Sequence, residues 1–424
     1  MTLTPEGYRP RLIDDRLAKH IKAFGAVSLE GPKWCGKTWC AENICNSEFK
    51  LTEKTGPLKN RDLAESNPEV ALRGEEPHLI DEWQEVPSLW DDVRNEVDKG
   101  GRKGRFILTG SSVPKRRTYI HSGTGRIAKL DMRTMTLFEM GDSTGSISLK
   151  DILSGKLDHM DCGEPSLDHI ADLIVRGGWP SDIGLDPEYY GLTAKQYVKE
   201  AVEDACRLDD KDRNREKMRM LLKSLARNES TLASDSKVME DMKTYEDSTI
   251  TPPTLSEYCD CLDRIHLIED TPCFRPNIRS EWRVGKTPKR HLTDVSLAVA
   301  AMEIGKERIV SDLGTFGFLF ESLCEHDLQL YSEYHECKFF HYRDGRNREI
   351  DAVIESPDGS WTAVEIKLGP GQIDSAAESL LKISGQFEKE GQAPKNLVVI
   401  CGMTRYAYKR PDGVMVLPIT ALGP

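Results

Sequence analysis

The stretch Gly31-Pro-Lys-Trp-Cys-Gly36-Lys37-Thr38 decides the fold of the first part of this 424-residue chain. It follows an apolar, β-prone run, Ala26-Val-Ser-Leu29, and precedes a segment that can open a helix, Thr38-Trp-Cys-Ala41. This is the G-x-x-x-x-G-K-[ST] pattern in the strand–loop–helix context that a phosphate loop requires. Glycines let the backbone turn so that successive N–H groups face phosphate oxygens, and the dipole of the following helix favours an anion. The sequence therefore predicts a nucleotide site.

The parts of this loop have different expected roles. The lysine supplies a positive charge to the β- and γ-phosphates of ATP, and the threonine hydroxyl binds Mg²⁺. The residues expected to contact the nucleotide are Gly31, Pro32, Lys33, Trp34, Cys35, Gly36, Lys37 and Thr38.

Two carboxylates end a second apolar run, Pro77-His-Leu-Ile-Asp81-Glu82. Asp81 is placed to hold Mg²⁺ through water, and Glu82 to polarise the water that attacks the γ-phosphate. A third run, Arg105-Phe-Ile-Leu-Thr109-Gly-Ser-Ser112, ends in small polar residues and so places Thr109 beside the nucleotide. P-loop kinases share the loop but lack the adjacent Asp-Glu pair, so hydrolysis is favoured over phosphoryl transfer to a small molecule.

Composition limits the remaining classes of protein. The chain is too long for one core, so two to four domains are expected. Mean hydropathy is −0.50, and no apolar run reaches the roughly 18 residues of a membrane-spanning helix. Met1–Gly7 lack the basic and apolar regions of a signal peptide. The 11 cysteines contain no C-x-x-C pair and indicate reduced thiols. We expect a cytoplasmic protein that does not associate with membranes.

A net charge of −12 argues against a generally basic surface for nucleic acid. Local patches could still bind a phosphate backbone. In the basic cluster Arg405–Arg410, tyrosines alternate with cations, which would suit either base stacking or core packing. The clusters are Arg102–Arg105, Lys115–Arg117, Lys286–Arg290, Arg343–Arg348 and Arg405–Arg410.

Strand and helix patterns indicate the organisation of the chain. Up to about Glu139, strands alternate with helical stretches, which predicts a parallel sheet covered on both faces. The pattern from about 147 to 225 is helical and is interrupted by the turn Gly177-Gly-Trp-Pro180. The strands are expected near 26–30, 48–52, 77–81, 105–110 and 127–132, and in the last block near 338–342, 349–355, 361–367 and 396–401.

Residues 226–275 predict a small helical unit. Thr231–Ser234 can cap one helix, and apolar residues recur with a helical period in Thr254–Ile265. Ile265–Asp270 is then expected to form a strand. Two helices and a β-wing suggest a winged helix-turn-helix, a unit that binds DNA or serves as a connector.

A second group of chemically active residues lies near the C-terminus. Glu365 and Lys367 are two apart on an expected strand and so face the same side, and pairing across the hairpin Ser356–Gly359 brings Asp351 alongside them. Two carboxylates can share a divalent cation, and a lysine beside them can orient the water that attacks a phosphodiester. Glu321, on the preceding helix, is a third candidate metal ligand.

At this point the chain resembles a known family. Gly31–Thr38, Ile80–Gln84 with Val86-Pro87, Ile107–Ser111, Gly178–Pro180 and Thr293-Asp294 together look like the prokaryotic AAA-type ATPases of the archaeal-ATPase-like group. Members carry a C-terminal domain of the PD-(D/E)xK, restriction-endonuclease-like type.

The resemblance implies an α/β protein with four domains. They are a five-stranded P-loop AAA-type ATPase core (1–146), a helical lid (147–225), a winged-helix-like domain (226–290) and a nuclease-like α/β domain (291–424). The family's functional residues correspond to Lys37, Thr38, Asp81 and Glu82 in the core, and to Asp351, Glu365 and Lys367 in the last domain.

The resemblance also assigns Arg126 as an arginine finger, since such fingers precede the fifth core strand. An arginine there could reach the γ-phosphate of a neighbouring subunit, which implies a homo-oligomer that can close into a ring of subunits. A surface ion pair is the alternative. Arg133 and Arg176 are rival candidates, the latter as a lid arginine that senses the nucleotide of its own subunit.

The leading hypothesis is a Mg²⁺-dependent ATPase that acts on DNA and carries a metal-dependent nuclease-like domain, with Mg²⁺ or Mn²⁺ bound by Asp351, Glu365 and Glu321. The alternative is a nucleotide-switched DNA-binding or signalling module whose nuclease fold is catalytically inactive.

Overall fold

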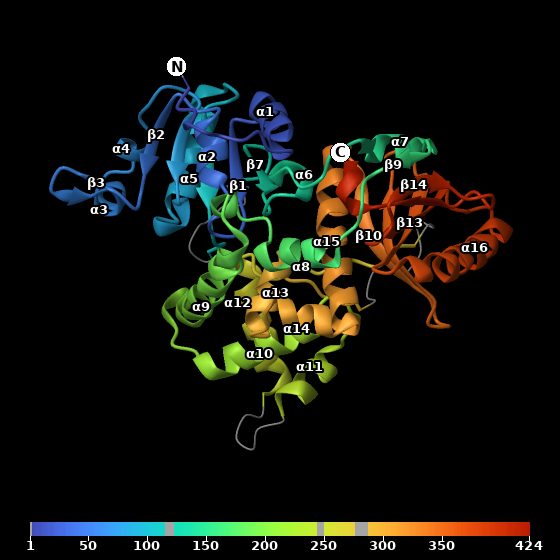
Figure 1. Cartoon of the computed structure of the whole chain (residues 1–424). Coiled ribbons are helices and arrows are strands. Elements are labelled where there is room, and N and C mark those ends of the chain that lie inside the picture. The colour runs from blue at the N-terminus through green and yellow to red at the C-terminus, as the bar shows by residue number, and fades with distance from the viewer. Residues whose placement is uncertain (1, 115–122, 244–249, 276–286) are drawn as a thin grey trace. The chain divides into compact units, whose positions relative to one another are not determined.

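The computed structural model describes residues 2–114, 123–243, 250–275 and 287–424 (Figure 1). The chain divides into two compact units. Unit 1 comprises Met1–Thr134, Asp204–Asp212 and Asp260–Leu267, and unit 2 comprises Met135–Glu203, Arg213–Cys259 and Ile268–Pro424.

Unit 1 contains a five-stranded sheet in the order β2-β5-β6-β1-β7, with every pair parallel. All five strands lie where the sequence pattern predicted them, within one or two residues. The strands are β1 (Ala26–Glu30), β2 (Ser47–Lys50), β5 (His78–Asp81), β6 (Phe106–Gly110) and β7 (Ile127–Asp131).

Helices cover both faces of this sheet because parallel strands need crossover connections. Val27 and Leu29 point to one face and pack with α1 and α2, whereas Ala26 points to the other and packs with α3, α4 and α5. The first helices are α1 (Ile13–Ala23), α2 (Lys37–Glu42), α3 (Asn60–Ser66), α4 (Glu69–Leu72) and α5 (Leu89–Gly100); a short hairpin is formed by β3 (Lys54–Thr55) and β4 (Leu58–Lys59).

The strand register brings the predicted nucleotide-binding segments to one edge of the sheet. Glu30, the last residue of β1, pairs with Gly110 of β6 and with Asp131 of β7. The phosphate loop follows β1 directly, and Glu82 follows β5. Ligands of open α/β sheets bind at this carboxyl edge.

Gly31 is required by a close backbone approach. A Cβ at this position would lie 2.0 Å from the carbonyl oxygen of Met132, which follows β7. We predict that Gly31→Ala lowers the free energy of unfolding by about 2–3 kcal/mol, the cost of overpacking, and weakens ATP binding. Thermal unfolding and nucleotide titration measure the two effects.

Gly385→Ala is the matched control, because a Cβ on this glycine of helix α16 (Ile373–Lys389) meets nothing within 4 Å. It should be neutral, or stabilising by up to about 1 kcal/mol, since alanine is the better helix former. Equal effects of the two substitutions would contradict the assigned role of Gly31.

Unit 2 contains a mixed seven-stranded sheet in the order β10-β11-β12-β13-β15-β14-β9. The pairs β10–β11 and β11–β12 are antiparallel, and β12–β13 and β13–β15 are parallel. The strands are β9 (Met160–Asp161), β10 (Lys338–Arg343), β11 (Glu349–Glu355), β12 (Trp361–Lys367), β13 (Asn396–Cys401), β14 (Tyr406–Lys409) and β15 (Met415–Leu417); β8 (Ile147–Ser148) pairs separately with β16 (Leu422–Gly423).

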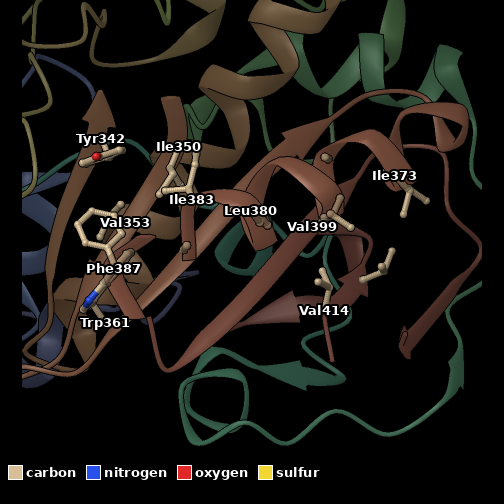
Figure 2. Packing of buried hydrophobic residues seen from close by; sticks show 14 of the residues in the cluster. Tyr342, Ile350, Val353, Trp361, Ile373, Leu380, Ile383, Phe387, Val399 and Val414 are labelled. Carbon is tan, nitrogen blue, oxygen red and sulfur yellow. The ribbon is translucent and has the colours of Figure 1, made fainter. Parts of the chain in front are cut away.

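One hydrophobic cluster holds α16 (Ile373–Lys389) on this sheet. Leu380, Ile383 and Phe387 of the helix pack against Val353 and Trp361 of the strands (Figure 2). The helix α15 (Leu313–Tyr334) also contacts β10, β11 and β12. Strands β10 to β13 lie where the sequence predicted strands, and Glu321 lies on a helix as expected, whereas β14 to β16 were not predicted.

The remaining helices are mostly in unit 2, with α9 and α12 contributing residues to both units. They are α6 (Leu137–Met140), α7 (Leu149–Ser154), α8 (Leu167–Arg176), α9 (Leu192–Arg207), α10 (Arg215–Arg227), α11 (Asp235–Met242), α12 (Pro252–Arg264), α13 (Val295–Ala301) and α14 (Lys306–Ser311).

The strand predicted over Ile265–Asp270 is wrong for most of its length. After α12 the chain turns, and His266 has a positive φ of 55°, which breaks an extended conformation. Only Ile268 forms a ladder contact, an isolated antiparallel bridge to Leu292. Similar bridges join Thr271 to Lys289 and Thr231 to Arg290.

The four expected domains stay a prediction. Two short strands of the expected lid pair with strands of the expected nuclease-like domain. In the expected lid, β9 pairs with β14 and β8 with β16, both near the C-terminus. The described residues include no helix that is long and apolar enough to cross a bilayer. All 11 cysteines are free thiols.

Candidate functional site

The phosphate loop joins β1 to α2. Gly36 has a φ of 101°, a left-handed conformation that glycine adopts without steric cost. Lys37 follows as the first residue of α2 and is buried. Its Nζ donates to the carbonyl oxygens of Gly31, at 3.0 Å, and Pro32, at 2.7 Å. An ammonium has three N–H donors, so these two carbonyls leave one for an anion inside the loop.

Arg11 supports the loop from outside and was missed by the sequence analysis. The buried guanidinium donates from Nη1 to the carbonyl of Cys35, at 2.7 Å, and from Nη2 to the carbonyl of Arg133, at 2.9 Å. It therefore ties the loop to the chain after β7. These partners lie 24 and 122 residues away in the sequence, so no local pattern could have revealed them.

Lys33, another residue of the loop, points to a different partner. Its Nζ lies 2.6 Å from Oδ2 of Asp204, and both side chains are about 40% exposed. Trp34 has a φ of 64° and is exposed. Their expected contacts with the nucleotide stay predictions.

Three oxygen-bearing side chains meet beside the loop. Oδ1 of Asp81 accepts hydrogen bonds from Thr38 Oγ1, at 2.8 Å, and from Thr109 Oγ1, at 2.5 Å. Burial raises the pKa of Asp81, and the two hydroxyl donors oppose that rise. Carboxylate and hydroxyl oxygens are the hard ligands that suit Mg²⁺, so the donor set at Asp81 and Thr38 fits the predicted cation.

Glu82 is oriented by its own set of contacts. Its Oε2 accepts from Ser111 Oγ, at 2.8 Å, and from Gln84 Nε2. Its backbone N–H donates to Thr109 Oγ1, at 3.2 Å, and its φ is 57°. A non-glycine residue in this left-handed conformation marks a position that the surrounding structure holds in place. The sequence predicted Glu82 and Thr109, whereas Ser111 and Gln84 as its partners emerge from the structure.

Arg126 lies at the opposite end of the strands from the phosphate loop. Its carbonyl accepts from Ala26 N, at the start of β1, and its Nε lies 2.8 Å from Oδ1 of Asp98. The side chain therefore makes the surface ion pair that was the alternative interpretation, and a finger role toward another subunit stays a prediction. Of the rivals, Arg133 follows β7 at the phosphate-loop end, and Arg176 in unit 2 pairs with Asp142.

The second predicted group is assembled in unit 2. Asp351 Oδ2 accepts from Lys367 Nζ, at 2.9 Å, and from the backbone N–H of Ile366, at 2.8 Å. Lys367 Nζ also lies 2.7 Å from Glu365 Oε2. The structure thus brings together the three residues predicted from the hairpin.

Glu321 contacts a different cation. Its carboxylate pairs with Lys289 Nζ, which also lies 2.7 Å from Glu325 Oε1 and 3.4 Å from the carbonyl oxygen of Asp351. Lys289 was predicted only as part of a basic cluster, and Glu325 was not predicted.

Charges in this cluster shift one another's pKa values. Burial and the nearby Asp351 raise the pKa of Glu321 and of Glu365 to about 8. Burial also opposes ionisation of Asp351, but Lys367 and Lys289 outweigh it and lower the pKa of Asp351. Glu321 and Lys367 line an open cavity of about 650 Å³ whose walls include Leu313 and Phe318.

No group of three or more His, Cys, Asp or Glu side chains in the described ranges is arranged to hold a metal ion. The metal ligands predicted here, Glu321, Asp351 and Glu365, are instead paired with lysines, and their role in metal binding stays a prediction.

Most of the described cations in the basic clusters that were candidates for DNA contact pair with carboxylates. The cation–carboxylate pairs are Arg102–Glu76, Arg105–Glu76, Arg290–Asp270, Arg348–Asp344, Arg405–Asp161 and Arg410–Asp374. In the last cluster Tyr408 packs on the hydrophobic core and Tyr406 is exposed. The cluster Lys115–Arg117 lies outside the described residues.

Residues 23–141 match the family described as "AAA domain". They carry the phosphate loop, Asp81, Glu82 and the parallel sheet. This segment is similar to AAA domains. Two further matches, at 167–308 and 316–422, are to domains of unknown function, DUF8612 and DUF4143.

Two curated proteins and one solved structure are similar to parts of this chain. The chain is 29% identical over 131 residues to Uncharacterized protein Rv2008c of Mycobacterium tuberculosis and to Uncharacterized protein Mb2031c of Mycobacterium bovis, covering 30% of this chain and 29% of each relative. It thus spans less than a third of these relatives. Among solved structures, the Walker-type ATPase PABY2304 of Pyrococcus abyssi is similar, with 13% identity, a TM-score of 0.45, and coverage of 71% of this chain and 97% of that one.

Proposed function

We propose that the protein hydrolyses ATP with Mg²⁺ in its AAA domain. The observation that carries the proposal is the hydrogen-bonded set in which Asp81 joins Thr38 to Thr109, while Ser111 and Gln84 orient Glu82. The experiment that tests it is phosphate release by the wild type and by Glu82→Gln.

Each residue of this set has a distinct task. Lys37 and the backbone of the loop bind the phosphates, and Glu82 orients the attacking water and accepts its proton. Thr38 and Asp81 would hold Mg²⁺, which neutralises charge on the phosphate oxygens when bound. The contacts to Ser111 and Gln84 keep the Glu82 carboxylate in place for that task.

For unit 2 we propose a nuclease-like fold. Support comes from the order of β11, β12, α16 and β13, with Asp351 on β11 and Glu365 and Lys367 on β12. Residues 226–290 are proposed to be winged-helix-like, because α10, α11 and α12 are followed by the bridges of Ile268 and Thr271 to the segment 287–292. Action on DNA is proposed on these two grounds, and a cytoplasmic location because the 11 cysteines are free thiols.

A second candidate function is a nucleotide-switched module whose nuclease-like domain binds a partner without cutting it. The pairing of Glu321 with Lys289 favours it, since a metal ligand is then already occupied. ATP turnover with single-stranded, duplex and branched DNA separates the candidates. A DNA-acting ATPase is stimulated by at least one of these, and a switch hydrolyses slowly with all of them.

Assembly into a homo-oligomer is proposed through Arg126. If Arg126 acts on the ATP of a neighbouring subunit, Arg126→Ala should lower turnover by about 10³-fold or more. Mixing Arg126→Ala with Lys37→Ala subunits should restore part of it, because each supplies what the other lacks. Arg73→Ala is the control, since Arg73 also forms an exposed ion pair, with Glu69. Full activity of a monomeric Arg126→Ala protein would refute the proposal.

A further inference from the structure

Lys289 is a buried cation inside the carboxylate cluster of unit 2. Only 6% of the residue is exposed. Its ammonium pairs with Glu321 and with Glu325, and lies 3.4 Å from the carbonyl oxygen of Asp351. It therefore lies among the groups that were predicted to surround a metal ion.

The fold fixes this lysine from two sides. Its backbone N–H donates to the Thr271 carbonyl, at 2.9 Å, and its carbonyl accepts from Thr271 N, at 2.8 Å. Its partner Glu325 is itself held by Ser230 Oγ, at 3.1 Å from Oε2. Glu325 was not among the predicted metal ligands. The cluster therefore contains an additional carboxylate that pairs with the Lys289 ammonium.

A divalent cation does not fit this arrangement. To bind Glu321 together with Asp351 and Glu365, it would have to lie within a few ångströms of the Lys289 ammonium. Like charges at such distances repel each other. A second ammonium, on Lys367, already pairs with Asp351 and Glu365.

We propose that Lys289 takes the place of a divalent cation in this cluster and so keeps Mg²⁺ and Mn²⁺ out of unit 2. This rests on the second candidate function, a nuclease-like fold that does not cleave. The test of the Lys289 proposal measures metal binding, whereas the test of the second candidate function measures ATP turnover. Either claim can therefore fail without the other.

The test counts bound Mn²⁺ on the full-length, nucleotide-free protein by electron paramagnetic resonance. Wild type and Asp351→Asn should bind the same amount, because no ion depends on Asp351. The Lys289→Met variant should bind one additional Mn²⁺ per chain. The double variant Lys289→Met with Asp351→Asn should not bind this additional ion. Lys338→Met, an exposed lysine on β10, should behave as wild type.

Removing Lys289 leaves the part-buried Glu321 without its cation and the buried Glu325 with His291, whose Nε2 lies 3.4 Å from Glu325 Oε2, as its remaining basic partner, and such a change can unfold a protein. The double variant Lys289→Met with Glu325→Gln removes one of these charges as well, and carries the test if circular dichroism shows the single variant to be unfolded. An Asp351-dependent Mn²⁺ ion in the wild type would overturn the proposal. So would a folded Lys289 variant that gains no ion.

Discussion

Glu82→Gln should lower ATP turnover by about 10²- to 10⁴-fold, the usual contribution of a general base, and leave ATP affinity unchanged. The amide cannot accept the proton of the attacking water, whereas the phosphates are bound by other groups. Gln at this position can still accept hydrogen bonds from Ser111 and Gln84, so the local structure should survive. Steady-state phosphate release and titration with a fluorescent ATP analogue measure the two quantities.

Glu85→Gln is the matched control. Glu85 lies on the same short turn, Trp83–Glu85, is 40% exposed and pairs with Arg61 at the surface. It should retain wild-type turnover. Near-normal turnover in Glu82→Gln would show that another group activates the water.

Lys37→Ala should abolish ATP binding at concentrations that saturate the wild type. The substitution removes the Lys37 ammonium, which lies inside the loop and donates to the carbonyl oxygens of Gly31 and Pro32. Without this positive charge the loop loses its attraction for the β- and γ-phosphates. A ligand at 100 times its dissociation constant stabilises the folded state by about 2.7 kcal/mol. ATP should therefore raise the melting temperature of the wild type and not that of the variant.

Lys22→Ala serves as the control for the loss of one positive charge, since Lys22 is exposed in the last turn of α1. It should show the wild-type response to ATP. A Lys37→Ala protein that is still stabilised by ATP would place the nucleotide elsewhere.

Local patterns explain what the sequence predicted. The strands of unit 1 are short apolar runs with turns between them, and the phosphate loop is contiguous in the chain. The cluster of Asp351, Glu365 and Lys367 was predictable because a hairpin joins β11 to β12 and fixes which residues face one another. In each case neighbouring residues carried the information.

Contacts between distant segments explain what was missed. Arg11 reaches Arg133, and Lys289 reaches Glu321 and Glu325, through pairings with no local signature. The strands β9, β14 and β15 are only two to four residues long, and β9 pairs with β14, more than 200 residues away in the sequence. The strand expected at Ile265–Asp270 failed because His266 adopts a positive φ, which apolar periodicity does not reveal.

The most direct test of ATP hydrolysis in the AAA domain is phosphate release from saturating ATP and Mg²⁺ by wild type and Lys37→Ala, purified in parallel. The site described here predicts turnover by the wild type that chelation of Mg²⁺ abolishes, and none above background by Lys37→Ala. Equal phosphate release by the two proteins would contradict it, because the activity would then not come from the loop that contains Lys37.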